Sequence, residues 1–194
     1  MKKNLEDYLI LYEDKFDKKL CKQTIKQIEK DLSFEQHKFF NPITGKSIPE
    51  SGDKELDIAW GDIDVTPILN EKVWNIIREY VKGFNFSWYT SWSGFTNAKF
   101  NKYKETRLMK EHCDHIHSMF DGERKGIPTL TVLTFLNDNY EGGELVFFQD
   151  KKIKPKQGSS LVFPSNFLFP HRVEPVTKGT RYSLVLWCLG RPFK

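Results

Sequence analysis

The chain has 194 residues, of which 39% are hydrophobic and 29% are charged, and its formal net charge is +4. This length and composition fit one folded domain over residues 1–194 rather than a disordered chain, and the small positive charge is far from the dense basic surface of a dedicated nucleic-acid binder. The three cysteines, Cys21, Cys113 and Cys188, are widely spaced, which argues against a disulfide framework or a cysteine-based zinc site.

The sequence shows neither the pattern of a signal peptide nor that of a membrane span. A short apolar run near the start is interrupted by Glu13, and no stretch approaches the roughly 20 apolar residues of a membrane helix. We therefore expect a cytoplasmic protein with no membrane partner. The oligomeric state is left open.

Residues 1–83 are expected to form a helical support region with two helices. Asp17 is the predicted N-cap of a helix that runs to about Asp31, because apolar residues recur there at helical spacing. The dipeptide Thr66-Pro67 predicts the start of a second helix, with Thr66 as its N-cap, and Gly83 predicts its end.

A strand and a loop are expected around these helices. Residues 8–12 are mostly apolar and predict a short strand. Residues 33–55 contain several glycines and prolines and predict a long loop. Loops of this length in compact domains often serve as lids or binding loops, so this segment and residues 118–127 are expected at the rim of a site.

After Gly83 the apolar pattern changes from helical to alternating, which predicts a β body over residues 84–190. Glycine and asparagine pairs such as Ser93-Gly94 and Gly142-Gly143 predict turns between its strands. The predicted strands are 84–92, 97–104, 108–117, 129–136, 144–149, 159–163, 171–176 and 180–188. The expected fold is therefore mainly β with N-terminal helices, in the form of a cupin-like double-stranded β-helix, or jelly roll.

The densest chemistry in the sequence lies in the run EHCDHIH. His112 and Asp114 are two residues apart, so a regular strand would place both side chains on one face. One imidazole and one carboxylate, together with a second histidine, make the facial triad that binds non-haem Fe(II). His171 is the candidate for that second histidine, because a jelly roll brings distant strands together.

Arg181 stands on an otherwise apolar run that ends near Trp187. An arginine there needs an anionic partner, because a lone buried charge is costly. Ser183 would share its face of the strand and add a hydroxyl donor, so the pair predicts a carboxylate-binding site. An internal carboxylate paired with Arg181 is the alternative.

These residues belong to an ordered series of motifs. In chain order they are HxD from His112, LND from Leu136, GGEL from Gly142, G-x4-FP from Gly158, H-x-V-x-P-V from His171 and R-x-S from Arg181. The series resembles the Fe(II)/2-oxoglutarate-dependent dioxygenases over about residues 84–190. It is most similar to their prolyl-4-hydroxylase-like branch, as found in bacteria and tailed phages.

The resemblance implies a set of roles. His112, Asp114 and His171 would hold Fe(II), and 2-oxoglutarate would chelate the metal while its far carboxylate pairs with Arg181, helped by Ser183 or Tyr103. O2 would be consumed, succinate and CO2 released and a substrate C–H bond hydroxylated, with ascorbate as an additional reductant. The expected substrate is a peptidyl proline. Many eukaryotic collagen-type members have Lys where this chain has Arg181.

Several residues have simpler interpretations. His115 and His117 would lie opposite His112 in a regular strand and are expected to pack or to line the substrate rim. His37 is expected to be solvated in its loop. Tyr103 either donates to 2-oxoglutarate or merely packs.

Two other functions compete with this one. The same chemistry on a nucleic-acid base or a small molecule has only the mild positive charge in its favour, and the second arginine expected soon after Arg181 in nucleic-acid demethylases is missing. A metal-binding jelly roll without oxidative turnover, or a zinc hydrolase, would leave the Arg181 and Ser183 pair without a purpose. The histidine order also departs from the HxHxDH motif of metallo-hydrolases.

Overall fold

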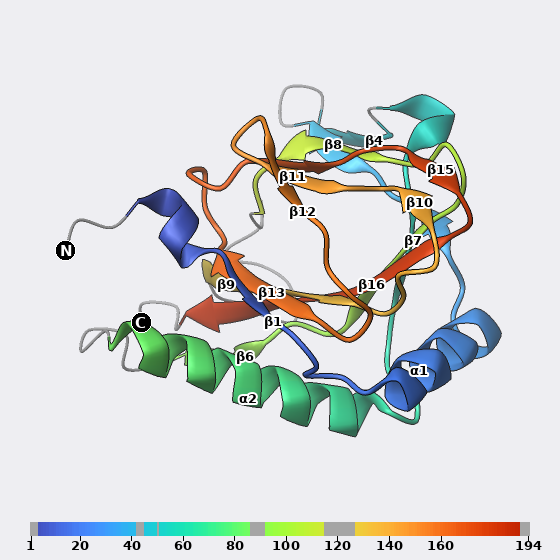
Figure 1. The fold of residues 1–194 in the computed structure, drawn as a ribbon. Coiled ribbons are helices and arrows are strands. Elements are labelled where there is room, and N and C mark those ends of the chain that lie inside the picture. Colours follow the sequence, from blue (N-terminus) through green and yellow to red (C-terminus); the bar gives the residue numbers. More distant parts are fainter. Residues whose placement is uncertain (1–3, 42–44, 50, 86–91, 115–126, 191–194) are drawn as a thin grey trace.

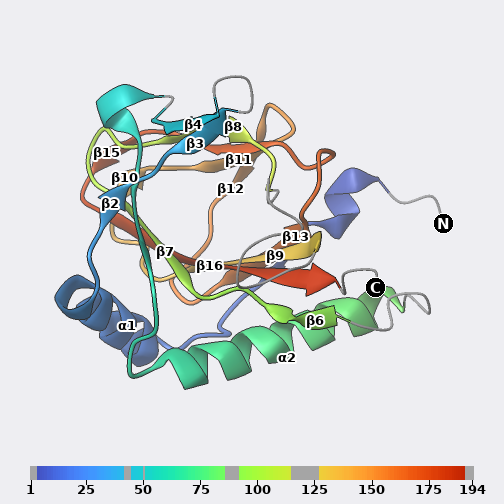
Figure 2. The same cartoon turned by 180° about the vertical axis from the view of Figure 1, so that it is seen from behind.

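Two β layers lie face to face, and the two long helices cover the outer side of one of them (Figures 1 and 2). The computed structural model describes residues 4–41, 45–49, 51–85, 92–114 and 127–190. The expected mainly β architecture with N-terminal helices is confirmed. No helix within these ranges is both long enough and apolar enough to cross a membrane.

The larger sheet has eight strands and contributes buried side chains to both hydrophobic clusters. Its order is β1 (Ile10–Tyr12), β13 (Ser160–Pro164), β9 (Ile127–Phe135), β16 (Arg181–Gly190), β7 (Lys99–Tyr103), β5 (Asp57–Trp60) and β2 (Glu35–Gln36), with β6 (Trp92–Phe95) also paired to β16. All of these pairs are antiparallel. Strands far apart in the sequence therefore lie side by side, as a jelly roll requires.

The smaller sheet faces it across the interior. Its order is β12 (Lys151–Ile153), β11 (Leu145–Phe147), β14 (His171–Val173) and β8 (Met109–His112). Two further antiparallel pairs extend this layer, namely β10 (Glu141–Gly142) with β15 (Val176–Lys178) and β3 (Phe39–Asn41) with β4 (Lys46–Ile48) (Figure 1).

The helices form where the sequence predicts them, with small shifts at their ends. In α1 (Lys18–Asp31) the Asp17 carboxylate accepts a hydrogen bond from the amide of Leu20, as expected of an N-cap. In α2 (Thr66–Phe84) Thr66 is the first helical residue, and its hydroxyl accepts from the amide of Ile63. Short 3-10 helices cover Leu5–Tyr8 and Gly52–Lys54.

The predicted end of α2 at Gly83 is wrong. Gly83 lies inside the helix, and Asn85 takes the left-handed conformation that closes it, with φ of 50°. Asparagine tolerates this region because its short polar side chain can bond locally, so it can replace glycine at a helix end.

Some strand predictions also need correction. The strand over 8–12 is shorter, because Leu5–Tyr8 forms a 3-10 turn before β1. The predicted loop over 33–55 contains β2, β3 and β4, and β5 follows it without having been predicted. Ser93-Gly94 lies within β6 rather than in a turn, and β12 lies outside the predicted strands. Residues 86–91 and 115–126, which include His115 and His117, lie outside the described residues.

Two hydrophobic clusters hold these layers together. One fills the space between the helices and the larger sheet, with Leu69, Val73 and Ile77 of α2 fully buried. The other fills the space between the two sheets, around Phe135, Phe147 and other large side chains. Side chains of the second cluster also line a pocket that contains His112, Asp114, His171 and Arg181.

Candidate active site

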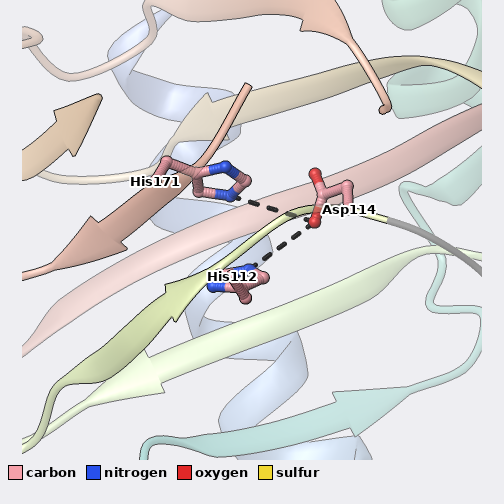
Figure 3. A group of neighbouring side chains, drawn as sticks. All are labelled: His112, Asp114 and His171. Carbon is pink, nitrogen blue, oxygen red and sulfur yellow. Dashed lines mark ion pairs between the residues drawn. The ribbon is translucent and has the colours of Figure 1, made fainter. Parts of the chain in front are cut away.

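Three side chains that could hold a metal ion meet between the two sheets, on the smaller sheet's inner side (Figure 3). His112 ends β8 and lies directly opposite His171 at the start of β14. Nε2 of His112 is 3.6 Å from Oδ1 of Asp114, and Nε2 of His171 is 3.9 Å from the same oxygen. One ligand atom from each residue lies within 4.8 Å of the others, so a single ion can contact all three.

The route by which Asp114 reaches this group differs from the prediction. β8 ends at His112, and Asp114 lies beyond the strand rather than on its inward face. Its carboxylate is instead held by β9 of the other sheet, where the Thr131 hydroxyl donates to Oδ2 at 2.7 Å. A hydroxyl pair between Thr131 and Ser165, also at 2.7 Å, fixes that threonine in turn.

The backbone sets the orientation of both imidazoles. Nδ1 of His112 lies 2.8 Å from the carbonyl oxygen of Lys110, and Nδ1 of His171 lies 3.0 Å from that of Phe169. A carbonyl only accepts, so each Nδ1 carries the proton and each Nε2 keeps a lone pair facing Asp114. Hydrogen bonds of this kind orient histidine ligands in metal sites.

The electrostatics of the group also favour a cation. Burial lowers the pKa of His171 to about 4, with His112 adding to the effect, so His171 is neutral at neutral pH. Burial alone would raise the pKa of Asp114, but His171, His112 and the Thr131 hydroxyl outweigh it and hold that pKa well below its usual range. A neutral imidazole beside an ionised carboxylate is the state that binds a metal ion.

A buried arginine lies deeper in the same pocket. Arg181 is 1% exposed, and no hydrogen-bond acceptor in the described residues lies within reach of its three guanidinium nitrogens. Ser183 is also buried on the same strand with an unpartnered hydroxyl. Within the described ranges no internal carboxylate pairs with Arg181, so the alternative partner considered above is absent there.

Tyr103 lies against this arginine. The Arg181 guanidinium carbon is 4.7 Å from the centre of the Tyr103 ring, and the tyrosine hydroxyl contacts the sulfur of Met109 at 3.7 Å. Burial raises the pKa of Tyr103 to about 12 despite the opposing effect of Arg181, so the phenol keeps its proton and can donate.

The pocket joins the metal-binding group to the arginine. It is lined by His112, Asp114, His171 and Arg181, and also by Lys99, Asn101, Tyr103, Thr131, Trp187 and apolar residues. Thr131, Lys99 and Asn101 were not predicted. The alternation of Lys99, Asn101 and Tyr103 along β7 was the available signal, because three polar groups on one face of a buried strand are unusual.

One predicted surface residue is buried instead. His37 is 9% exposed, and its Nδ1 lies 3.8 Å from a carboxylate oxygen of the fully buried Glu55. The expectation of a solvated histidine was wrong because β2 and β3 carry this segment over the edge of the sheet, where His37 packs on Phe39. Phe39 also contacts the ring of His112.

The residues present fit the two groups that the sequence suggested. Two imidazoles and one carboxylate are the donor set of non-haem Fe(II) sites. The unpartnered guanidinium, with a hydroxyl nearby, fits a carboxylate, which bonds arginine through two parallel hydrogen bonds. A short diacid that also reaches the metal satisfies both.

Comparison with known protein families agrees with this donor set. The model of the 2OG-Fe(II) oxygenase superfamily matches residues 98–189, a stretch that contains all of these site residues. Residues 98–189 belong to the 2OG-Fe(II) oxygenase superfamily.

Relatives in sequence are hydroxylases. A PKHD-type hydroxylase of Alteromonas mediterranea is 37% identical over 95 residues, which is 45% of this chain and 41% of the relative. Human prolyl 3-hydroxylase 2 is 43% identical over 63 residues, or 29% of this chain and 9% of the relative. The chain thus spans well under half the length of these relatives.

Solved structures share the fold over nearly the whole chain. The viral collagen prolyl hydroxylase of Paramecium bursaria Chlorella virus-1, in its 2OG complex, has a TM-score of 0.70 at 19% identity and covers 95% of this chain and 97% of its own. A Trichoplax adhaerens prolyl hydroxylase, solved with a peptide fragment of the hypoxia inducible factor, has a TM-score of 0.68 at 20% identity and covers 94% and 83%. The jelly-roll fold is confirmed.

Proposed function

We propose that the protein is an Fe(II)- and 2-oxoglutarate-dependent dioxygenase that hydroxylates a C–H bond of its substrate. The observation that carries this proposal is the presence, in one pocket, of the His112, Asp114 and His171 group and the unpartnered Arg181. A metal site alone would fit many functions, and a buried arginine alone would fit several anions. Together they fit a metal whose chelating co-substrate also carries a distant carboxylate.

Each residue then has a defined task. His112, Asp114 and His171 would hold Fe(II), which when bound supplies the activation of O2 and the oxidation of the substrate. Arg181 would bind the far carboxylate of 2-oxoglutarate, with Ser183 and Tyr103 donating hydrogen bonds beside it. The surrounding apolar side chains would exclude water from the reacting groups.

The proposed substrate is a peptidyl proline, with succinate and CO2 as the other products. The likeness to prolyl hydroxylases, one of them solved with a peptide, supports a peptide partner. The same proposal includes ascorbate as an additional reductant. It includes no nucleic-acid partner. A nucleic-acid base or a free small molecule is tested beside the peptides.

We also propose that residues 1–194 form one domain in a reducing, cytoplasmic setting. The cluster between the helices and the larger sheet draws on both the 1–83 and the 84–190 regions, which supports one shared core. Cys21 and Cys188 are buried in the core, where cysteine packs as a small apolar residue, and this suits a reducing compartment.

The test is succinate formation by purified protein supplied with Fe(II), 2-oxoglutarate and a panel of proline peptides, oligonucleotides and free amino acids. We expect succinate formation to require Fe(II), 2-oxoglutarate and a proline peptide, and to be lost in Asp114→Ala. The matched control is Glu111→Ala, which removes a nearby carboxylate that is half exposed and pairs with Arg172. Turnover that survives Asp114→Ala would refute the metal assignment.

A second measurement separates this function from a metal-binding module without turnover. Without oxygen, Fe(II) and 2-oxoglutarate together should give a weak visible charge-transfer band. Its absence from protein that binds Fe(II) would favour the non-oxidative alternative.

A further inference from the structure

A second cation lines the pocket at the end opposite Arg181. Lys99 begins β7 and points to the same face as Asn101 and Tyr103, because alternate residues of a strand share a face. It is 4% exposed, although lysine is rarely buried to this extent without a partner. The proposed reaction does not use Lys99.

The surroundings of Lys99 do not neutralise its charge. Its ammonium group lies 5.5 Å from the ring centre of Trp187 and 5.9 Å from that of Trp60, which gives a weak cation–π attraction on two sides. Within the described residues no carboxylate pairs with it, unlike its neighbour Lys102, which pairs with Glu29 at 2.7 Å. A buried, unpaired ammonium costs free energy that an anionic ligand would recover.

The charge of Lys99 persists at neutral pH. Burial lowers the pKa of Lys99 to about 8, while Asp114 and Glu55 act in the opposite direction. The side chain is therefore largely protonated in the cytoplasmic pH range, and it can attract an anion.

The register of the sheet places the two cations apart. Arg181 of β16 faces Tyr103, and Lys99 faces Val185, so four residues of strand, or about 13 Å, separate the two positions. The proposed metal ligands line the same pocket. Arg181 would take one carboxylate of 2-oxoglutarate and the metal would take its other end, which leaves Lys99 available to a third anionic group.

We propose that Lys99, flanked by Trp60 and Trp187, is a substrate subsite that binds a carboxylate close to the carbon that is hydroxylated. This inference rests on the proposed function and narrows its substrate class. The carboxylate comes either from an acidic side chain of a peptide or from the free carboxyl group of an amino acid. Trp60 lies opposite Lys99 in the ladder between β5 and β7 and is 45% exposed, so the proposed subsite borders solvent-exposed surface.

The experiment compares matched probes that differ in one charge. Acetylated and amidated proline peptides carrying Glu, Gln or Lys next to the proline form one arm, and free L-proline against L-prolinamide forms the other. Binding is measured by tryptophan fluorescence without oxygen, with Fe(II) and 2-oxoglutarate present, and succinate formation is measured separately. In one of the two arms, we expect the probe that carries the extra carboxylate to bind at least tenfold more tightly than its neutral counterpart.

Variants of two neighbouring lysines complete the design. Lys99→Met and Lys99→Gln should lose this preference, while Lys99→Arg should keep it. Lys102→Met is the control, since Lys102 lies on the same strand but outside the pocket and should retain the preference. Two neutral variants are used so that the test does not depend on the folding of one.

Three results would overturn the subsite. The first is equal binding of charged and neutral probes in both arms. The second is a loss of preference in Lys102→Met as large as that in Lys99→Met. The third is a fall in 2-oxoglutarate affinity in the Lys99 variants as large as their fall in affinity for the carboxylate probe, which would assign Lys99 to the co-substrate. Succinate formation without a carboxylate preference would leave the proposed function standing and reject the subsite. A carboxylate preference that depends on Lys99, without succinate formation, would support the subsite and reject the proposed function.

Discussion

Arg181 and Tyr103 face each other on β16 and β7, with the guanidinium carbon 4.7 Å from the tyrosine ring centre. Phe135 contributes a second ring at 5.4 Å. Aromatic faces attract a cation but do not accept its N–H bonds in the manner of a carboxylate. The arginine is therefore held in place while its hydrogen-bonding capacity stays unused, which prepares it for an anionic ligand.

Replacing this arginine should have opposite effects on binding and on stability. Arg181→Met should weaken 2-oxoglutarate binding about 10- to 100-fold, because a hydrogen bond to a charged group contributes about 1.5–3 kcal/mol. The ligand-free protein should unfold at the same or a higher temperature, because an unpartnered buried charge is removed. Titration of 2-oxoglutarate and thermal unfolding without ligand check the two parts.

The control for this change is Arg78→Met, on an exposed part of α2. It should alter neither quantity. Unchanged 2-oxoglutarate affinity in Arg181→Met would contradict the role given to Arg181.

The sequence predicted the proposed metal ligands and Arg181 better than the residues that surround them. The spacing of His112 and Asp114, and the isolated Arg181 on an apolar run, are local patterns that can be interpreted without knowing the fold. Thr131 could not be found in this way, because its contact with Asp114 joins two sheets and depends on their packing. The same holds for Lys99, whose aromatic neighbours come from β5 and β16.

The errors in the fold have physical reasons as well. β5 was missed because Asp57–Trp60 is short and follows a segment rich in turn residues. Asp114 was expected on a strand, whereas the ladder between β8 and β14 already ends at His112. Its position is set by a hydroxyl on the opposite sheet, which strand alternation does not predict.

Thr131 should matter for metal affinity rather than for folding alone. Thr131→Val removes the hydroxyl that donates to Asp114 at 2.7 Å, so the carboxylate loses its fixed orientation. Loss of such a supporting contact typically weakens metal binding about 10- to 100-fold. We expect Fe(II) or Mn(II) affinity to fall within this range, as measured by competition with a chelator.

Thr134→Val is the matched control on the same strand. It removes a buried hydroxyl pair with Ser160, and within the described residues this hydroxyl bonds to none of the proposed metal ligands. Both variants should lose some stability, and only Thr131→Val should lose metal affinity. Equal metal affinity in the two variants would show that Asp114 needs no support from β9.

Acidification should destabilise the metal-free protein through His171. Its pKa is about 4 in the folded protein, because burial disfavours the charged ring, and about 6.5 in the unfolded chain. Between these values the unfolded chain binds a proton that the folded protein does not, so the free energy of unfolding falls as the pH falls. From pH 6.5 to pH 4.5 this loss amounts to about 2 to 3 kcal/mol.

His171→Gln isolates this contribution, because glutamine does not titrate. Urea unfolding of both metal-free proteins at several pH values gives the difference in their free energies of unfolding. That difference should shift in favour of the variant by about 2 to 3 kcal/mol over this range. A constant difference would mean that His171 takes up its proton in the folded protein too.

Gly158 should tolerate no side chain. Its φ is +83°, and a Cβ built there would lie 2.0 Å from the carbonyl oxygen of Phe16. Two backbone hydrogen bonds hold it in place, from its own amide to the carbonyl of Phe135 at 2.8 Å and from the Phe16 amide to its carbonyl at 3.0 Å. The neighbouring backbone cannot retreat without breaking this link between the N-terminal segment and the larger sheet.

Gly158→Ala should therefore lower the free energy of unfolding by at least about 2 kcal/mol, from the left-handed strain together with the clash. Gly45→Ala separates the two causes, because Gly45 has a similar φ of +65° with no atom within 4 Å of the added Cβ. It should cost only about 1 kcal/mol. Urea unfolding of the two variants measures both values, and equal losses would show that the approach of Phe16 to Gly158 is not close in solution.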